Sequence, residues 1–523
     1  MPSEPPAATT DALNPAFSAE GLRQAVRHGS RRTLFAQLAS HVVSLVMLAS
    51  LYHLVTPGDF GLIGMALPVI MFLRIFTSLG MNIATVQSRD LTSALISHLF
   101  WLHVALGVLM ALVTAGVAPL VAWFYREPDV TWVLGALSAT SLASAIGLQH
   151  IALLERNLRL GSAATCRLVG QGVGGVLAIA LAISGWGVWA LVAQQYVELL
   201  ALAATAWYFE PWRPSSPRSG ERVGATLRFG GYFTMTQIMH NLLANADKIL
   251  VGFLLGREAL GFYSQAYNVM MKPVVVLTTP LTSIMLPALS RAAHDAKNYS
   301  QIVLGFQRLL AVASFPAGVG LMIVGRETML VLGGETWDDA GPLLMILAAS
   351  ILVQGFITMA GTIFISAGRW RAMLAGSVGM LAVLVPGVLM GYFTGRALGS
   401  SLPGAGWTLS VAPATSTEWL PAALGAAWGF SLTTCLLLFL PYMLFCLRLA
   451  GVSPLAWARQ LVRPALAALA MGIIVFVVRE ILTSYTALPP ALLLLIEVGA
   501  GVAAYTLFAR REIRWCLEQL RRF

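Results

Sequence analysis

Apolar runs of about 20 residues recur along this chain, and they limit its fold more than any other feature. Backbone polar groups find no water inside lipid, so a run that crosses a membrane forms a helix or a strand of a closed barrel. Barrel strands alternate apolar and polar residues, and these runs do not. Of the 523 residues, 58% are hydrophobic and 11% are charged, whereas soluble domains carry roughly 25% charged residues. We therefore expect an all-α polytopic membrane protein.

We predict about fourteen transmembrane helices from these runs. A polar, Pro- and Ala-rich stretch precedes them, and we expect residues 1–30 to form a disordered cytoplasmic tail. An insert rich in Gly, Ser, Pro and Ala, residues 394–420, separates the eleventh span from the twelfth. The predicted spans are 33–55, 61–84, 99–123, 131–152, 164–185, 187–208, 228–255, 262–286, 303–325, 339–365, 370–393, 421–447, 460–480 and 487–509.

The basic residues predict the orientation of these spans. With the N-terminus in the cytoplasm, 25 of the 33 Lys and Arg residues fall on the inner face and 5 on the outer face. Such an inner excess is the usual pattern of membrane proteins. We therefore expect both termini inside the cell and the insert 394–420 outside. The net charge of +10 is a topology signal that also suits anionic membrane lipids, and we expect no nucleic-acid partner.

The chain divides into two halves of similar layout. The stretches 54–74 and 254–274 each leave the membrane through a short turn and re-enter it, and each opens a block of about six spans. Two such halves are typical of transporters. We predict an N-terminal six-helix bundle at 31–209, a cytoplasmic linker at 210–227, a C-terminal six-helix bundle at 228–450, and two peripheral helices with a basic cytoplasmic tail at 451–523.

Four motifs occur in order along the chain: "HLVTPGDFGLIGMA", "NADKILVGFLLGREALGFYSQAY", "LTSIMLPALSR" and "WDDAGPLLMILA". On these motifs, over roughly residues 30–450, the chain resembles the polysaccharide transporter family. This is the flippase branch of the multidrug/oligosaccharidyl-lipid/polysaccharide exporter superfamily. Within it, the chain is most similar to exporters of the colanic acid and lipopolysaccharide-precursor type.

The resemblance implies two six-helix bundles arranged in a V, with spans 1, 2, 7 and 8 lining a central cavity. It implies transport of undecaprenyl-pyrophosphate-linked oligosaccharide across the bacterial inner membrane, for exopolysaccharide or O-antigen synthesis, by alternating access. Membrane lipids, and possible contacts with a glycan polymerase and export machinery, belong to the same expectation. No covalent chemistry, cofactor or metal is expected.

Charged residues inside the spans are the candidate site residues, because each costs about 2.5–3.5 kcal/mol to insert and needs a partner or a cavity. Away from helix ends they are Arg74, Glu198, Asp247, Lys248, Lys272 and Glu497. We assign Glu497, in the last span, to helix packing rather than ion coupling.

The seventh span carries a polar strip of His240, Asn241, Asn245, Asp247 and Lys248. Adjacent residues point about 100° apart on a helix. We therefore expect Asp247 and Lys248 not to pair with each other. Two interpretations stay open: the strip bonds a neighbouring helix and holds the halves together, or it lines a water-filled cavity.

The resemblance favours the cavity, because it places Arg74, Lys248 and Lys272 on lining spans. The guanidinium of Arg can donate two parallel hydrogen bonds to a phosphate, and the ammonium of Lys acts as a point charge. These cations are therefore suited to binding a pyrophosphate. We predict that the substrate is bound by Arg74, Lys248, Lys272, Asn241 and Asn245. We predict a coupling or inter-bundle role for Asp247, Glu198 and His240.

Other motifs predict structure rather than chemistry. "GQGVGG" at 170–175 has neither the strand nor the Lys of a nucleotide loop, so we expect close helix packing there. Asp338 or Asp339 of "WDDAG" is expected to cap a helix N-terminus. The four cysteines form no CxxC pair, and we expect buried thiols.

Two rival functions remain open at this stage. A drug or metabolite cation antiporter of the same fold would favour acidic groups in its cavity. A membrane glycan polymerase or ligase would need a large outer loop with catalytic acids, Arg and His, whereas the insert 394–420 holds only Arg396 and Glu418.

Overall fold

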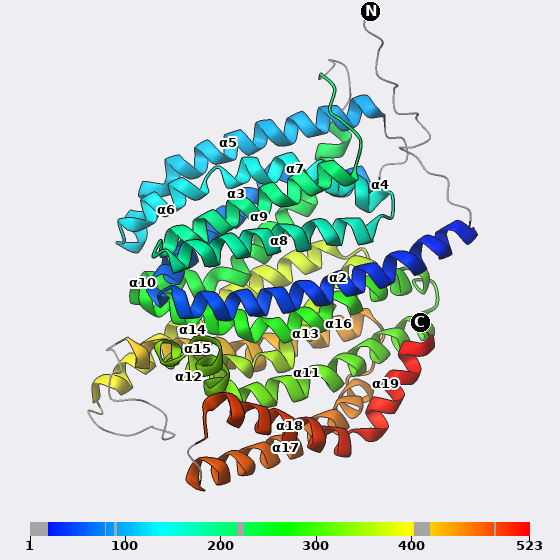
Figure 1. The fold of residues 1–523 in the computed structure, drawn as a ribbon. Helices are drawn as coiled ribbons and strands as arrows, with labels where there is room; N and C mark the ends of the chain where they lie inside the picture. Colours follow the sequence, from blue (N-terminus) through cyan, green and yellow to red (C-terminus); the bar gives the residue numbers. More distant parts are fainter. Residues whose placement is uncertain are drawn as a thin grey trace, which may run out of the picture. The chain divides into compact units, whose positions relative to one another are not determined.

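The structure is a computed structural model, and it describes residues 19–78, 80–87, 92–216, 224–401, 419–485 and 488–522. Within these residues every regular element is a helix, as Figure 1 shows. The prediction of an all-α fold is thus confirmed. The chain forms two compact units, Met1–Leu242 and Leu243–Phe523, which are called unit 1 and unit 2 below.

Unit 1 is built from the helices of the first half of the chain. They are α2 (Ala19–Leu54), α3 (Pro57–Ser78), α4 (Met81–Gln87), α5 (Ser93–Tyr125), α6 (Asp129–Leu137), α7 (Thr140–Arg156), α8 (Leu160–Ile183), α9 (Val188–Phe209) and the first part of α10 (Gly224–Arg291). Helix α8 lies between α2 and α9, and α7 packs against both α5 and α9.

Small residues allow a close contact between α8 and α9 in unit 1. A Cβ atom added at Gly170 would lie 2.6 Å from the carbonyl oxygen of Glu198, and one added at Gly174 would lie 3.0 Å from that of Gln194. On the same helix, an added Cβ at Gly175 would clash with the side chain of Met47 on α2. The "GQGVGG" segment therefore serves close helix packing, and that prediction is confirmed.

Unit 2 contains the rest of α10 and all later elements. They are α11 (Ala296–Gly333), the 3₁₀ turn η1 (Glu335–Trp337), α12 (Ala340–Ala348), α13 (Ile351–Ser366), α14 (Trp370–Ser401), α15 (Leu420–Leu432), the π-helical turn η2 (Thr433–Leu438), α16 (Phe439–Leu449), α17 (Pro454–Tyr485), α18 (Pro490–Phe508) and α19 (Arg510–Arg522). Helix α11 packs against α12, α13, α17 and α18, while α14 packs along α15.

Helix α10 is bent within unit 2. Gly256 has φ 83° and ψ −173°, which a residue with a side chain rarely adopts, so two helices meet at this residue. The turn lies between the two predicted spans 228–255 and 262–286. It brings Tyr263, beyond the bend, back to Asp247 before it.

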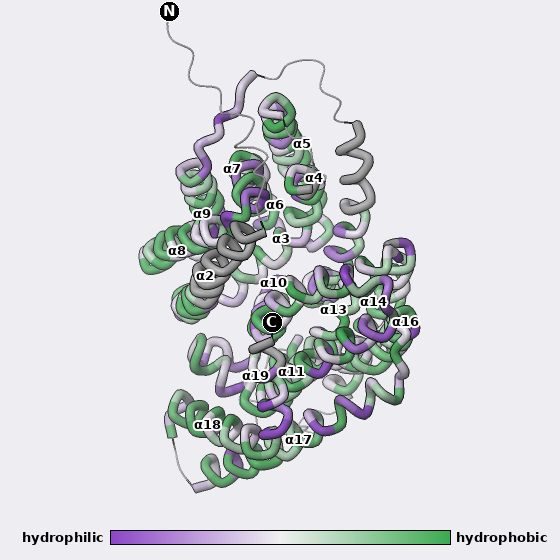
Figure 2. The backbone as a smooth tube through the Cα atoms, turned by 90° about the vertical axis from the view of Figure 1, so that its right-hand side faces the viewer, coloured by the Kyte–Doolittle hydropathy of each residue, from purple (hydrophilic) through white to green (hydrophobic). Residues whose placement is uncertain are grey.

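Eleven helices in the described residues are long and apolar enough to cross a membrane, and the bent pair α12 and α13 raises the number to twelve. One of the eleven, Thr234–Arg291, contains the bend at Gly256. In Figure 2 apolar residues, in green, run along much of α8 and α18. A polytopic membrane protein is therefore confirmed, and the number of fourteen spans stays a prediction.

The predicted limits differ from the helix bounds in several places. Helix α2 begins at Ala19, so the described end of the predicted tail is helical rather than disordered. Helix α14 runs on to Ser401, into the predicted insert, while residues 402–418 and 1–18 lie outside the described residues. The division into units falls inside α10, after Leu242.

The prediction of a cap at "WDDAG" is confirmed for the position of Asp339, which is the N-cap residue of α12, but not for a capping hydrogen bond. Asp339 precedes α12 and makes no capping hydrogen bond with its side chain. Asp338 instead accepts two hydrogen bonds from the guanidinium of Arg326, at 2.7 and 2.8 Å. A forked pair with Arg is stronger than a cap made to a backbone N–H, which explains the outcome.

Candidate functional site

A cavity of about 290 Å³ lies in unit 1, between α3, α4, α7 and the first part of α10. Its volume is at the lower end of ordinary ligand pockets. The lining residues are Met71, Arg74, Ile75, Thr77, Ser78, Gly80, Asn82, Ser144, Leu148, Thr234 and Gln237. Arg74 is the one charged residue among them, and the other polar side chains are neutral.

Arg74 is held in the cavity wall by a neutral partner. Its Nη2 donates a hydrogen bond to Oγ of Ser144 on α7, at 3.0 Å. The carboxylate of Glu198 on α9 acts on Arg74 electrostatically. A guanidinium has five N–H donors, so one hydroxyl leaves most of its capacity for a ligand.

Two buried polar atoms beside Arg74 lack a hydrogen-bond partner among the described residues. They are Oγ1 of Thr77 and Oδ1 of Asn82. A buried polar atom without a partner costs free energy, unless water or a ligand supplies the missing bond. The Thr77 hydroxyl and the Asn82 amide can also donate hydrogen bonds, so the wall is suited to an oxygen-rich ligand.

The first part of α10 carries two of the predicted strip residues, His240 and Asn241. Gln237, which lines the cavity, lies three and four residues before them, so all three share one face of the helix. His240 is exposed and Asn241 is half-buried. This part of the strip therefore continues the polar face that begins at the cavity.

The rest of the strip lies in unit 2 and forms a closed cluster. Nζ of Lys248 lies 3.4 Å from Oδ1 of Asp247 and donates to the carbonyl of Ala244 at 2.8 Å. The same ammonium lies 3.4 Å from the centre of the Tyr267 ring. The hydroxyl of Tyr263 donates to Oδ2 of Asp247 at 3.1 Å.

The prediction that Asp247 and Lys248 do not pair is therefore wrong. The two Cβ atoms do point apart, but the four-methylene stem of Lys248 is long enough to turn its ammonium back to the carboxylate. Asp247 is 1% exposed and Lys248 is 9% exposed, so both charges are removed from solvent and a nearby opposite charge is strongly favoured.

The Asp247–Lys248 cluster is electrically balanced, which bears on its predicted roles. One carboxylate and one ammonium cancel, and the Tyr267 ring and the Ala244 carbonyl stabilise the cation further. The partners that the structure gives Asp247 both belong to unit 2. Substrate binding by Lys248 and an inter-bundle bond from Asp247 stay predictions.

The remaining predicted residues are spread over both units. Asn245 is half-buried on α10, one turn before the cluster. Lys272 is half-buried on α10 beyond the bend, in unit 2, whereas Arg74 belongs to unit 1. Glu198 is half-buried on α9, and its backbone packs against the glycines of α8.

Sequence reasoning missed Thr77, Asn82 and Ser144. Thr77 had a detectable signal, because it follows Arg74 by three residues and so lies on the same helix face. Ser144 had none, since it is 70 residues away in the chain and reaches Arg74 through the packing of α7 near α3.

A family model described as "Polysaccharide biosynthesis protein" matches residues 50–342, which is more than half of the chain. The chain belongs to this family, as its motifs indicated.

Three curated relatives extend the match. The teichuronic acid biosynthesis protein TuaB of Bacillus subtilis is 24% identical over 486 residues, 92% of this chain and 94% of its own length. The succinoglycan biosynthesis transport protein ExoT of Rhizobium meliloti is 26% identical over 61% of this chain and 64% of its own length. The lipopolysaccharide biosynthesis protein WzxC of Escherichia coli is 23% identical over 73% of this chain and 78% of its own length.

Solved structures show the same fold. A lipid II flippase, MurJ, in an inward closed conformation superposes with a TM-score of 0.69 at 10% identity, over 93% of this chain and 99% of the flippase. A multidrug resistance transporter of the MATE family, in an inward-facing conformation, has a TM-score of 0.58 at 14% identity, over 79% of this chain and 96% of the transporter.

Proposed function

We propose that this protein is a flippase that moves a lipid-linked oligosaccharide across the bacterial inner membrane, with both termini in the cytoplasm. Membership of the polysaccharide biosynthesis family supports this proposal, as does likeness to relatives named for teichuronic acid, succinoglycan and lipopolysaccharide synthesis. The flippase binds and releases its cargo and performs no covalent chemistry. We propose a glycan polymerase and an export machinery as its partners.

The observation that carries the proposal is the unit 1 cavity. Its one charged lining residue is Arg74, which is bonded to a hydroxyl rather than to a carboxylate. A polyprenyl pyrophosphate presents negative charge and many acceptor oxygens, and Arg recognises phosphate through parallel N–H donors. Thr77 and Asn82 lie beside Arg74 with polar groups ready for sugar or phosphate oxygens.

The proposed transport cycle is alternating access. One transporter family with this fold has been solved in an inward-facing form and in an outward-facing form, with TM-scores of 0.58 and 0.53 to this chain. The same arrangement of helices is therefore compatible with both orientations of a binding site. Cargo would be bound by Arg74 on the inner side and released when the site opens outward.

The test is export of polysaccharide in a deletion strain that carries plasmid copies of the gene. Arg74→Gln should lower export about tenfold or more, because a hydrogen bond to a charged group contributes about 1.5–3 kcal/mol. The matched control is Arg167→Gln on α8 of the same unit, where the Arg side chain is 54% exposed and its pair with Glu155 contributes little.

Two outcomes would contradict the proposal. Export by Arg74→Gln at the level of the control, with equal amounts of protein in the membrane, would remove Arg74 from cargo binding. Resistance to cationic dyes that depends on this gene, with unchanged polysaccharide export in the deletion strain, would instead indicate a cation antiporter.

A further inference from the structure

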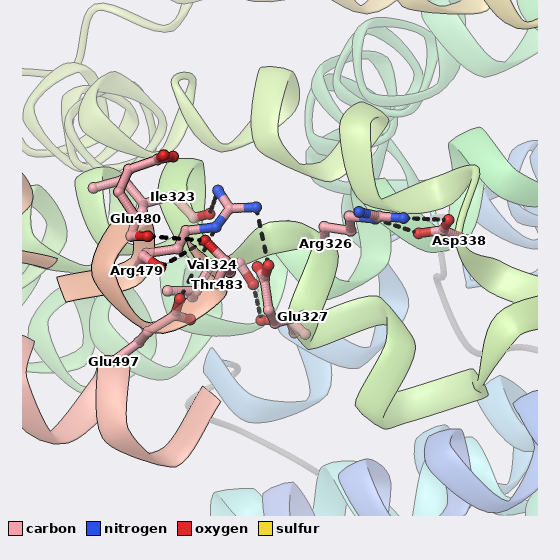
Figure 3. A network of polar contacts seen from close by, with 10 residues as sticks. Ile323, Val324, Arg326, Glu327, Asp338, Arg479, Glu480, Thr483 and Glu497 are labelled. Atoms are coloured by element: carbon pink, nitrogen blue, oxygen red, sulfur yellow. Dashed lines mark hydrogen bonds and ion pairs between the residues drawn. The ribbon is translucent and has the colours of Figure 1, made fainter. Parts of the chain in front are cut away.

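A buried charged cluster lies in unit 2, away from the Asp247–Lys248 pair, where α11, α17 and α18 meet. Each helix contributes one residue: Glu327 from α11, Arg479 from α17 and Glu497 from α18. In Figure 3 the guanidinium of Arg479 reaches the carboxylate of Glu327, and the side chain of Glu497 points toward the same cluster. We predicted that Glu497 serves helix packing. Packing alone does not explain why three charged side chains meet between these helices.

Arg479 makes close contacts with two groups other than Glu497. Its Nη2 lies 2.9 Å from Oε1 of Glu327, and its Nη1 donates to the carbonyl of Ile323 at 2.9 Å. Its Nε lies 4.0 Å from Oε1 of Glu497, which is too long for a hydrogen bond. Glu327 and Arg479 thus form the close ion pair, and Glu497 is left over.

Glu497 is fully buried, with 0% exposure, and Glu327 is 5% exposed. Among the described residues, both carboxyl oxygens of Glu497 and Oε2 of Glu327 have no hydrogen-bond partner. A buried carboxylate normally accepts several hydrogen bonds or faces an opposite charge of its own. Glu497 has neither in its ionised form.

The neighbouring charges do not supply the missing cation. On α11, Arg326 is bonded to Asp338 at 2.7 Å, and Arg308 is paired with Glu512 of α19 at 2.6 Å. On α17, Glu480 is acidic and exposed. The cluster therefore holds two carboxyl groups against one guanidinium, which leaves one negative charge in an apolar environment.

We propose that Glu497 is a proton-binding site. A proton from solvent binds one carboxylate oxygen of Glu497 and converts it to a neutral carboxylic acid, so that the cluster carries no net charge. The Oε2 atom of Glu327, which has no hydrogen-bond partner among the described residues, remains an acceptor within the same cluster. No group of three His, Cys, Asp or Glu side chains suited to a metal ion is present in the described part of the chain, which favours a proton over a metal.

The bound proton holds α18 against α11 and α17. These helices share an apolar core that includes Val324, Met471, Val475 and Ala504. Loss of the proton places an unpaired negative charge inside that core and weakens the packing. The site goes beyond the proposed flippase activity and does not depend on the identity of the cargo.

The sign of the pH dependence follows from proton counting. In the unfolded chain Glu497 releases its proton above about pH 4.3, the ordinary value for Glu. The folded protein keeps this proton to higher pH, so it binds more protons than the unfolded chain does. The free energy of unfolding therefore falls as the pH rises from about 4.3 to the pH at which the folded protein releases this proton.

The experiment is thermal melting of the full-length protein in detergent, from about pH 5 to about pH 8 at constant sodium concentration. The wild-type melting temperature should fall with pH by about 1 °C per unit more than that of Glu497→Gln, whose neutral amide imitates the protonated acid. Glu480→Gln, on the exposed side of α17, is the matched control and should follow the wild type.

Infrared spectroscopy gives a second readout, which does not rely on melting. The wild type should show the carbonyl stretch of a protonated carboxylic acid at neutral pH, and Glu497→Gln should lose it. Equal pH slopes in the wild type and Glu497→Gln would overturn the proposal. So would a sodium-dependent rise in melting temperature at fixed pH that Glu497→Gln lacks, because it would identify a metal cation as the occupant.

Discussion

Arg74 in unit 1 and Lys248 in unit 2 are both long basic side chains on apolar helices, yet they are stabilised in different ways. Lys248 is 9% exposed and has a carboxylate, a carbonyl and an aromatic ring around its ammonium. Arg74 lines a cavity, and its guanidinium donates a hydrogen bond to the neutral hydroxyl of Ser144. The comparison teaches that a cation in the membrane identifies a site only after its partners are known.

The difference separates two kinds of contribution. A closed pair such as Asp247–Lys248 acts on folding, since removing one partner leaves a buried charge uncompensated. We expect a cation in a polar cavity wall, such as Arg74, to act on binding, because its one hydrogen bond to Ser144 leaves further N–H donors for a ligand. Substitutions in unit 2 should therefore change stability first, and substitutions in unit 1 should change transport first.

The largest effect is expected for Asp247→Ala, which leaves the buried ammonium of Lys248 without its carboxylate partner. It should destabilise the protein by about 3–5 kcal/mol, measured by thermal or denaturant unfolding of the purified protein. The double variant Asp247→Asn with Lys248→Met removes both charges and should recover most of this loss. If the double variant is no more stable than Asp247→Ala, the pair is not what holds the cluster together.

Arg74→Gln should have the next largest effect, and on transport rather than stability. Its melting temperature should stay close to that of the wild type, while export falls about tenfold or more because the ligand loses a charged donor. A large drop in melting temperature would show that Arg74, like Lys248, stabilises the fold, and would contradict the difference drawn between them.

Arg74→Lys should give an intermediate result. It keeps the positive charge but loses the planar fork that binds two phosphate oxygens together. Export should lie between those of the wild type and Arg74→Gln, with a raised concentration of cargo needed for half-maximal transport. Full activity in Arg74→Lys would mean that a point charge is sufficient at this position.

The smallest effect is expected for Thr77→Val, a substitution of similar shape that removes one hydroxyl from the cavity. One neutral hydrogen bond contributes about 0.5–1.5 kcal/mol, so transport should fall roughly two- to tenfold. Thr114→Val on α5 is a matched control, since the hydroxyl of Thr114 already bonds the carbonyl of Met110 within its own helix. Equal losses in both variants would point to general damage to the helices.

The fold was largely predictable, because membrane helices follow from apolar runs and backbone hydrogen bonding alone. The close packing at Gly170 and Gly174 was predictable for the same local reason, since small residues at this spacing allow helices to approach. A charge near the middle of a span needs a partner or a polar space, which is why Arg74 could be singled out from the sequence. It lines the unit 1 cavity, and its role in substrate binding stays a prediction.

The partners of the charges were not predictable. Whether Lys248 turns back to Asp247 depends on the rotation of a flexible stem and on the bend at Gly256, which brings the Tyr263 hydroxyl to the same carboxylate. The pair of Arg326 with Asp338 and the meeting of Glu327 with Arg479 depend on how helices pack in three dimensions. The spacing of residues along one helix does not predict contacts between different helices.

Direct binding of a pyrophosphate to the unit 1 cavity is the measurement that tests the central claim. A short-chain polyprenyl pyrophosphate, and the polyprenol of the same length, are titrated into the wild type, Arg74→Gln and Arg167→Gln in lipid nanodiscs. The account predicts that Arg74→Gln binds the pyrophosphate at least about ten times more weakly than the other two proteins, and that all three bind the uncharged polyprenol alike. Equal affinity of all three proteins for the pyrophosphate would contradict it.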